Sequence, residues 1–256
     1  MNSPLEIARG YAAAGAAKTK LPPLKMLLLA VMAGLFIAFG AVASTVASSG
    51  VSITGVARLI SGAVFPVGLT LVILAGSELF TGNCLIIIPV LTGEVRISAF
   101  IRCLFIVYLG NLIGSVIVAG LVVLGGIPAL HAATDTALAK VSLPFGEAFV
   151  RGVLCNILVC LAVWVSFAGK TPGSKIAAIY LPILAFVVCG FEHSVANMYY
   201  IPVGILTAAK HGADVPGLTW GAMFLKNLLP VTLGNMAGGM ALGAAYWGIY
   251  LNGKER

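Results

Sequence analysis

Six long apolar regions alternate with short polar segments along the chain. The first, residues 26–47, contains no charged residue, and an α-helix needs about 20 apolar residues to cross the hydrocarbon core of a bilayer. The others cover residues 59–90, 103–125, 152–169, 176–206 and 227–251. Glycine and polar residues interrupt the second and fifth regions. The pattern predicts an all-α polytopic membrane protein with six transmembrane helices, of which helices 2 and 5 are broken.

The composition excludes a soluble domain. Hydrophobic residues make up 60% of the 256 residues and charged residues only 9%, whereas soluble domains carry about 25% charged residues. The mean hydropathy of +1.08 agrees. The net charge of +7 is dispersed singly or in pairs between apolar regions, so no basic face could follow a phosphate backbone. We therefore expect a lipid bilayer around the protein and no nucleic-acid partner.

The basic residues predict the orientation of the bundle, because cytoplasmic loops carry an excess of Lys and Arg. Alternate segments on one side carry ten of them: Arg9, Lys18, Lys20, Lys25, Arg96, Arg102, Lys170, Lys175, Lys254 and Arg256. The opposite segments carry five: Arg58, Lys140, Arg151, Lys210 and Lys226. We predict a multi-pass protein of the cell inner membrane with both termini cytoplasmic. Residues 1–25 form a cytoplasmic segment, 26–251 the six-span transmembrane domain and 252–256 a cytoplasmic tail.

The chain contains two similar halves. The second apolar region carries Gly76-Ser-Glu78-Leu-Phe-Thr-Gly-Asn83, and the fifth carries Gly190-Phe-Glu192-His-Ser-Val-Ala-Asn197. The third and sixth regions share Gly-Asn-x-x-Gly, starting at Gly110 and Gly234, which is typical of close helix packing. Three spans per half place the second copy upside down in the membrane. We predict an inverted 3+3 repeat, residues 26–126 and 146–251, whose broken helices meet near the midplane and form a substrate path.

The two breaks hold the candidate functional residues. Half-helix N-termini at a break point partial positive charge at the path, which favours an anion. Glu78 and Glu192 are the acidic residues placed deep in spans, and His193 is the histidine within an apolar span. Ionisable groups inside a membrane are costly and usually face the interior, so they indicate the functional region. A histidine there can offer a hydrogen bond or exchange a proton with a weak-acid anion.

Each of these residues also has a structural interpretation. His193 could be a buried neutral histidine whose hydrogen bonds are satisfied by the bundle. For both glutamates we favour hydrogen bonds to the unwound backbone and to nearby amide side chains, because a bare carboxylate would oppose an anion. Those side chains are Asn83, Asn156 and Asn197.

Other residues are less distinctive by themselves. Lys140 has the pattern of an ordinary loop lysine. Some residues near the breaks could form constrictions, although such residues more often pack in a core or face lipid: Thr81, Leu79, Phe65 and Phe186. The five cysteines lie in or beside apolar regions with no metal-ligand spacing, so they favour packing. We expect no metal, no cofactor and no enzymatic activity.

Over residues 26–251 the sequence resembles the formate/nitrite transporter family. The specific segments are Gly76-Ser-Glu-Leu-Phe-Thr-Gly82, Cys155-Asn-Ile-Leu-Val-Cys-Leu-Ala-Val-Trp164, Gly190-Phe-Glu-His-Ser-Val-Ala-Asn-Met198 and Val231-Thr-Leu-Gly-Asn235. The resemblance implies an aquaporin-like homopentamer with one pore per protomer. It also implies transport of small monovalent anions of weak acids: formate, nitrite or hydrosulfide.

The resemblance also assigns roles to residues. His193 and Thr81 match the family's central pore residues, and Lys140 matches a lysine that supplies positive potential near the path. Leu79 and Phe80 match one constriction, and Phe65 and Phe186 match the other. The polar shell around the histidine is matched by Glu192, Asn156 and Asn197. The implied mechanism is either protonation of the anion through His193 or passage as an anion. The Ser77-Glu78 pair slightly favours nitrite or hydrosulfide over formate.

Two other functions share part of this pattern. An aquaporin-like channel for neutral solutes would also have inverted halves with Asn at the breaks, but the Asn-Pro-Ala motif typical of such channels is absent from the sequence. An intramembrane enzyme could use Glu192 and His193 as an acid–base pair or as metal ligands. Adjacent helical residues point about 100° apart, which disfavours a shared metal.

Overall fold

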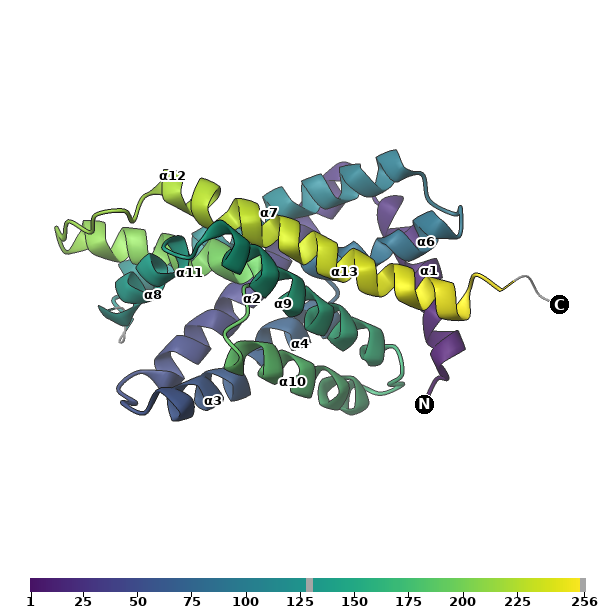
Figure 1. Cartoon of the computed structure of the whole chain (residues 1–256), viewed down its shortest axis with the longest axis horizontal. Helices are drawn as coiled ribbons and strands as arrows, with labels where there is room; N and C mark the ends of the chain where they lie inside the picture. Colours follow the sequence, from purple (N-terminus) through teal and green to yellow (C-terminus); the bar gives the residue numbers. More distant parts are fainter. Residues whose placement is uncertain (128–130, 254–256) are drawn as a thin grey trace.

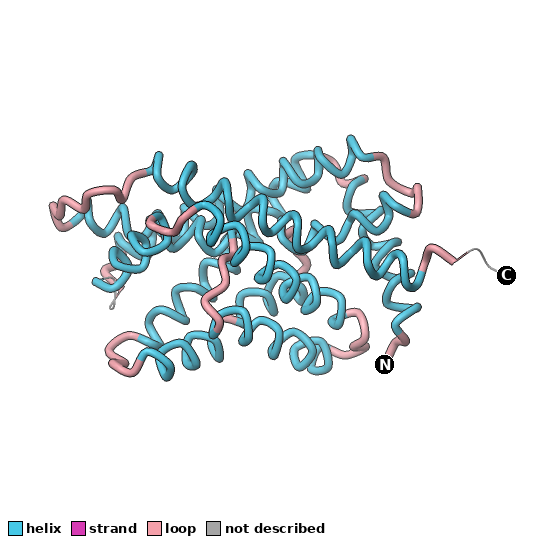
Figure 2. Tube along the Cα trace, in the orientation of Figure 1, coloured by secondary structure: helices cyan, strands magenta, loops and turns pink. Residues whose placement is uncertain are grey.

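A computed structural model describes residues 1–127 and 131–253 of the chain. Lys254 and Arg256, which contributed to the predicted orientation, lie outside the described residues together with the end of the predicted tail. Within the described part the structure consists of helices and loops (Figures 1 and 2). This confirms the all-α class.

Each half begins with a short helix that precedes a long one. The first, α1 (Pro4–Thr19), starts with a capping box between Ser3 and Glu6, which satisfies two free backbone N–H groups. It is followed by α2 (Pro23–Ser48). In the second half α8 (His131–Val141) precedes α9 (Phe145–Ser166). Helix α1 packs against the bundle through buried Ile7, Ala8 and Tyr11.

Two segments are broken where the sequence predicts it. In the first half α3 (Thr54–Val64) and α4 (Pro66–Ala75) lead to extended residues 77–79. The chain then continues as α5 (Phe80–Asn83), η1 (Cys84–Ile86) and α6 (Ile87–Leu91). In the second half α10 (Pro172–Val188) leads through residues 191–193 to α11 (Ser194–Lys210). Gly76 and Gly190 begin the breaks with φ of 76° and 68°, a left-handed conformation that a side chain disfavours.

The remaining long helices close the bundle. These are α7 (Ile97–Leu124) and a composite of α12 (Trp220–Ala222), the π-helical turn η2 (Met223–Leu228) and α13 (Leu229–Tyr250). Among the described residues, five helices are long and apolar enough to cross a membrane: Pro23–Ser48, Thr54–Ala75, Ile97–Leu124, Phe145–Ser166 and Trp220–Tyr250. The fifth predicted span, residues 176–206, is divided between α10 and α11, which have 17 residues each. Six crossings therefore stay a prediction.

Glycines bring the paired long helices into contact. A Cβ on Gly114 of α7 would collide with the Val31 carbonyl oxygen of α2, and one on Gly238 of α13 with the Val153 carbonyl oxygen of α9. The absence of a side chain lets the two backbones approach within van der Waals distance. The close packing predicted from the Gly-Asn-x-x-Gly motifs is confirmed. It positions Asn111 and Asn235, the second residues of these motifs, beside the two breaks.

The packing predicts a large difference between two glycines of α7. We expect Gly114→Ala to lower the free energy of unfolding by about 1–3 kcal/mol, because the added methyl group must push α2 away. Gly120→Ala is the matched control: a Cβ there has no atom within 4 Å, and alanine favours a helix. Thermal unfolding in detergent measures both. Equal melting temperatures for the two variants would contradict the packing argument.

Candidate functional site

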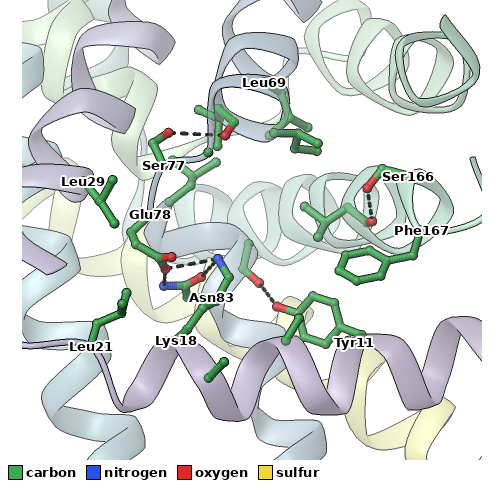
Figure 3. A pocket seen from close by; sticks show the side chains of 18 of the residues that line it. Tyr11, Lys18, Leu21, Leu29, Leu69, Ser77, Glu78, Asn83, Ser166 and Phe167 are labelled. Atoms are coloured by element: carbon green, nitrogen blue, oxygen red, sulfur yellow. Dashed lines mark hydrogen bonds and ion pairs between the residues drawn. The ribbon is translucent and has the colours of Figure 1, made fainter. Parts of the chain in front are cut away.

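Two cavities open toward the two breaks. The α1 cavity, about 510 Å³, is lined by α1, α2, α4 and the first break, with Lys18, Glu78, Leu79 and Asn83 on its walls (Figure 3). The α8 cavity, about 400 Å³, is lined by α8, the end of α2, α3, α10 and the second break. Lys140, Glu192 and His193 are among its residues. Each half of the chain therefore contributes a short helix and a break to one cavity.

A contact between Thr81 and His193 joins the two breaks. Thr81 Oγ1 lies 3.0 Å from His193 Nε2, and the two residues are 0% and 3% exposed. His193 Nδ1 accepts a hydrogen bond from the Ala196 backbone N–H at 3.0 Å, so the ring caps α11. A backbone N–H can only donate, so Nδ1 of the neutral ring carries no proton. The proton is therefore on Nε2, which donates it to Thr81.

Apolar side chains lie on both sides of this contact. Leu79 is buried on the wall of the α1 cavity. Phe65 and Phe186 line the α8 cavity, their ring centroids 5.5 Å apart in an edge-to-face arrangement. The Phe186 ring also stacks on His193 at 5.8 Å. Phe80, which the resemblance groups with Leu79, is buried against Tyr108 at 5.0 Å and is not among the residues that line the two cavities.

Each cavity holds a buried glutamate paired with a lysine and an asparagine. In the α1 cavity Lys18 Nζ lies 3.1 Å from Glu78 Oε2 and donates to Asn83 Oδ1 at 3.0 Å (Figure 3). Asn83 Nδ2 donates to Glu78 at 2.8 Å. Lysine and amide donors therefore neutralise and solvate this carboxylate, as a buried charge requires.

The α8 cavity repeats this arrangement. Lys140 Nζ lies 2.9 Å from Glu192 Oε1, and Asn197 Nδ2 donates to Glu192 Oε2 at 2.6 Å. The side chain of Lys140 is 16% exposed and that of Lys18 is 28% exposed, so both ammonium groups can meet a solute in their cavities.

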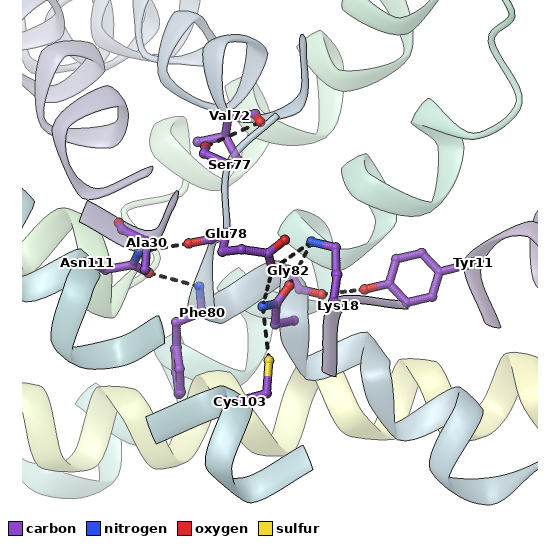
Figure 4. A network of polar contacts seen from close by, with 11 residues as sticks. Tyr11, Lys18, Ala30, Val72, Ser77, Glu78, Phe80, Gly82, Cys103 and Asn111 are labelled. Atoms are coloured by element: carbon purple, nitrogen blue, oxygen red, sulfur yellow. Dashed lines mark hydrogen bonds and ion pairs between the residues drawn. The ribbon is translucent and has the colours of Figure 1, made fainter. Parts of the chain in front are cut away.

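The unwound backbone has other partners than the sequence suggested. Asn111 Nδ2 donates to the Glu78 carbonyl at 2.9 Å, and its Oδ1 accepts from the Phe80 N–H at 2.9 Å (Figure 4). Asn235 makes the same two contacts with the Glu192 carbonyl and the Ser194 N–H. The prediction that the glutamate side chains bond the unwound backbone is wrong, because the asparagines of the long helices occupy those positions.

Asn156 donates hydrogen bonds to the backbone at the Thr81–His193 contact. Its Nδ2 donates to the Thr81 carbonyl at 3.2 Å and to the Asn235 carbonyl at 2.6 Å. Asn156 therefore positions Thr81 and does not bond either glutamate, whereas Asn83 and Asn197 do so as expected.

Lys18 and Tyr11 were not predicted as site residues from the sequence. Lys18 entered only as a charge that sets topology, although a third repeated motif singles it out. Ala17-Lys18-Thr-Lys-Leu-Pro22 and Ala139-Lys140-Val-Ser-Leu-Pro144 both fit Ala-Lys-x-x-Leu-Pro. The Tyr11 hydroxyl donates to the Gly82 carbonyl at 2.9 Å, and burial raises the pKa of this phenol well above its ordinary value. Tyr11 therefore stays a donor and ties α1 to the first break.

The structure defines a helical membrane protein with two charged cavities and a buried Thr81–His193 contact between the two breaks that line them. Within the described residues, no three His, Cys, Asp or Glu side chains come together as metal ligands. Residues 5–248 match the family model described as formate/nitrite transporter. The chain belongs to the formate/nitrite transporter family.

Similar proteins agree over nearly the full length. The chain is 41% identical to the probable formate transporter of Methanothermobacter thermautotrophicus, over 97% of each chain. Among solved structures it resembles an FNT family ion channel with a TM-score of 0.87 and 34% identity, over 95% of this chain and 98% of that one. It also resembles a pentameric formate channel with formate bound, with a TM-score of 0.79 and 35% identity, over 90% of this chain and 98% of that one.

Proposed function

We propose that the protein is a membrane channel for small monovalent anions of weak acids, including formate. The observation that carries the proposal is the buried Thr81–His193 contact between two cavities, each of which presents a lysine. The names of the similar proteins support formate as one of the transported anions.

The geometry suggests how an anion crosses. Lys18 or Lys140 attracts it into a cavity, where water still solvates it. It then loses water between Leu79 on one side and Phe65 and Phe186 on the other, a step that costs free energy unless polar groups replace the water. The His193 Nε2–H and the Thr81 hydroxyl supply those hydrogen bonds.

Proton coupling fits the same geometry. The Nε2 proton of His193 is the one aimed at Thr81, so it is the proton that a passing anion could receive. Gaining a proton on Nδ1 would instead remove the cap of α11. In this proposal the ring takes a proton from cavity water on Nδ1 only while the anion is bound, and the resulting imidazolium gives its Nε2 proton to the anion. After the neutral acid leaves, proton exchange with water restores the Nε2–H form and the cap of α11.

The proposal includes an architecture. Six spans form inverted halves with both termini cytoplasmic in the inner membrane, which places the α1 cavity inside and the α8 cavity outside. The matched contacts of Asn111 and Asn235 support the repeat. Five protomers assemble, as the name of one similar structure says of that protein.

Flux into proteoliposomes tests the proposal. Formate, nitrite and hydrosulfide are compared with chloride at about pH 5.5 and about pH 7.5, because proton coupling through a histidine makes flux depend on pH. Selective weak-acid flux that rises at the lower pH supports the proposal. Water permeability without anion flux would instead favour the aquaporin-like alternative. The relative fluxes also test the prediction from Ser77-Glu78 that nitrite or hydrosulfide is preferred over formate.

A further inference from the structure

The last long helix contains a π-helical turn next to the α8 cavity. This turn, η2, covers Met223–Leu228 and carries Asn227, which is 0% exposed. A π-helical turn holds one residue more than an α-helical turn and often occurs at functional sites. The corresponding helix of the first half, α7, is α-helical over its whole length. The two halves therefore differ at this position.

Asn227 contacts both α8, which carries Lys140, and the side chains around Glu192, which pairs with that lysine. Its Nδ2 donates to the backbone carbonyl of Lys140 at 2.9 Å, and its Oδ1 accepts from Asn197 Nδ2 at 2.8 Å. Glu192 Oε2 lies 3.4 Å from the same Nδ2. One buried amide thus links the end of α8, which carries Lys140, to the carboxylate that pairs with Lys140.

The first half has a weaker contact at this place. Cys103 stands the same number of residues before Asn111 as Asn227 stands before Asn235. Asn83 Nδ2 lies 3.7 Å from the Cys103 thiol, a poorer acceptor than an amide oxygen. Arg102 donates to the Thr19 carbonyl at 2.8 Å, so the end of α1 is held by the neighbouring residue. The direct link from the lysine helix to the glutamate is a property of the second half.

We propose that Asn227 is a positioning residue for the Lys140–Glu192 pair and sets how tightly the α8 cavity captures an anion. The inference rests on the proposed function. Asn227 holds the Lys140 backbone carbonyl, the Asn197 amide nitrogen and Glu192 Oε2, so the ammonium group keeps one position. Its effect is confined to the cavity that it contacts.

The half-saturating formate concentration, measured separately from each face, tests this role. Right-side-out and inside-out membrane vesicles give the two faces. We expect Asn227→Leu to raise this concentration about threefold to tenfold from the face that bears the α8 cavity and to leave the other face unchanged. Asn227→Cys, which introduces the residue of the first half, should give a smaller rise. If the Asn227→Leu protein does not assemble, the Asn227→Cys variant provides the test. Lys226→Met, on the same turn but exposed, is the control and should change neither face.

A second comparison separates positioning from general stability. In the double variant Lys140→Met/Glu192→Gln no charged pair is left to position, so adding Asn227→Leu should change the half-saturating concentration no further. A shift of equal size from both faces, no shift at all, or a shift that persists in the double variant would overturn the inference. Absence of saturable formate flux in the unmodified protein would overturn the proposed function, and this inference with it.

Discussion

Replacing His193 with asparagine is expected to lower formate and nitrite flux by at least about tenfold while the protein stays folded. Asparagine is among the best N-cap residues, so it can keep the cap on α11. Its shorter side chain cannot also reach Thr81, which lies 3.0 Å from the imidazole Nε2. A hydrogen bond to a charged group contributes about 1.5–3 kcal/mol, and about 1.4 kcal/mol corresponds to a factor of ten in rate.

His193→Ala should lower flux as far and destabilise the protein as well, since the cap contributes about 1 kcal/mol. Proteoliposome flux and thermal unfolding measure the two effects separately, with His211→Ala, an exposed histidine at the end of α11, as the control. Unchanged flux in His193→Asn would place the anion path elsewhere. In His193→Phe, pH-dependent transport that remained intact would exclude the proton relay while leaving the path in place.

Much of the fold could be predicted because membrane helices leave a strong apolar pattern. Long uncharged regions predicted the spans, and the two Gly-x-Glu motifs predicted the breaks between α4 and α5 and between α10 and α11. Residues 176–206 were predicted as one span but form α10 and α11, so length and composition identify five spanning helices among the described residues. The π-helical turn at Met223–Leu228 was not predicted, because π-helical turns are rare and occur mostly as single turns inside α-helices, too short to show a period of their own.

Residues of the candidate site could be predicted where a motif in the neighbouring sequence indicates them. Residues whose contacts depend on the packing of distant helices could not. His193 and Thr81 follow from their places in the breaks. Lys18 is 60 residues from Glu78, so its role depends on how α1 packs under the bundle, which the weak apolar pattern of α1 does not specify. The unwound backbone and Asn156 were wrongly predicted as partners of the glutamates for a related reason. Asn111, and not a carboxylate, bonds the unwound backbone because α7 packs close to the first break. That close packing depends on glycines such as Gly114.

Replacing Lys140 with methionine is expected to have two separable effects. The first concerns stability, because Glu192 would lose the cation 2.9 Å away while its own side chain is only 6% exposed. Removing one partner of a buried ion pair costs about 3–5 kcal/mol, since an unpaired charge stays in a medium of low dielectric constant. We therefore expect Lys140→Met to give a low yield of folded protein and a lower melting temperature in detergent.

The second effect concerns transport and is isolated by the double variant Lys140→Met/Glu192→Gln. Glutamine has the shape of glutamate without its charge and can still accept the Asn197 hydrogen bond, so we expect most of the lost stability to return. The cavity would then lack the ammonium group that attracts an anion, so flux at low formate concentration should stay at least about tenfold below that of the unmodified protein.

Lys226→Met removes an exposed charge that does not line the α8 cavity and controls for the overall charge. Full flux in a stable double variant would show that Lys140 serves only to neutralise Glu192. Low flux with restored stability would assign it to anion capture, and the pair Lys18–Glu78 should then behave in the same way in the α1 cavity.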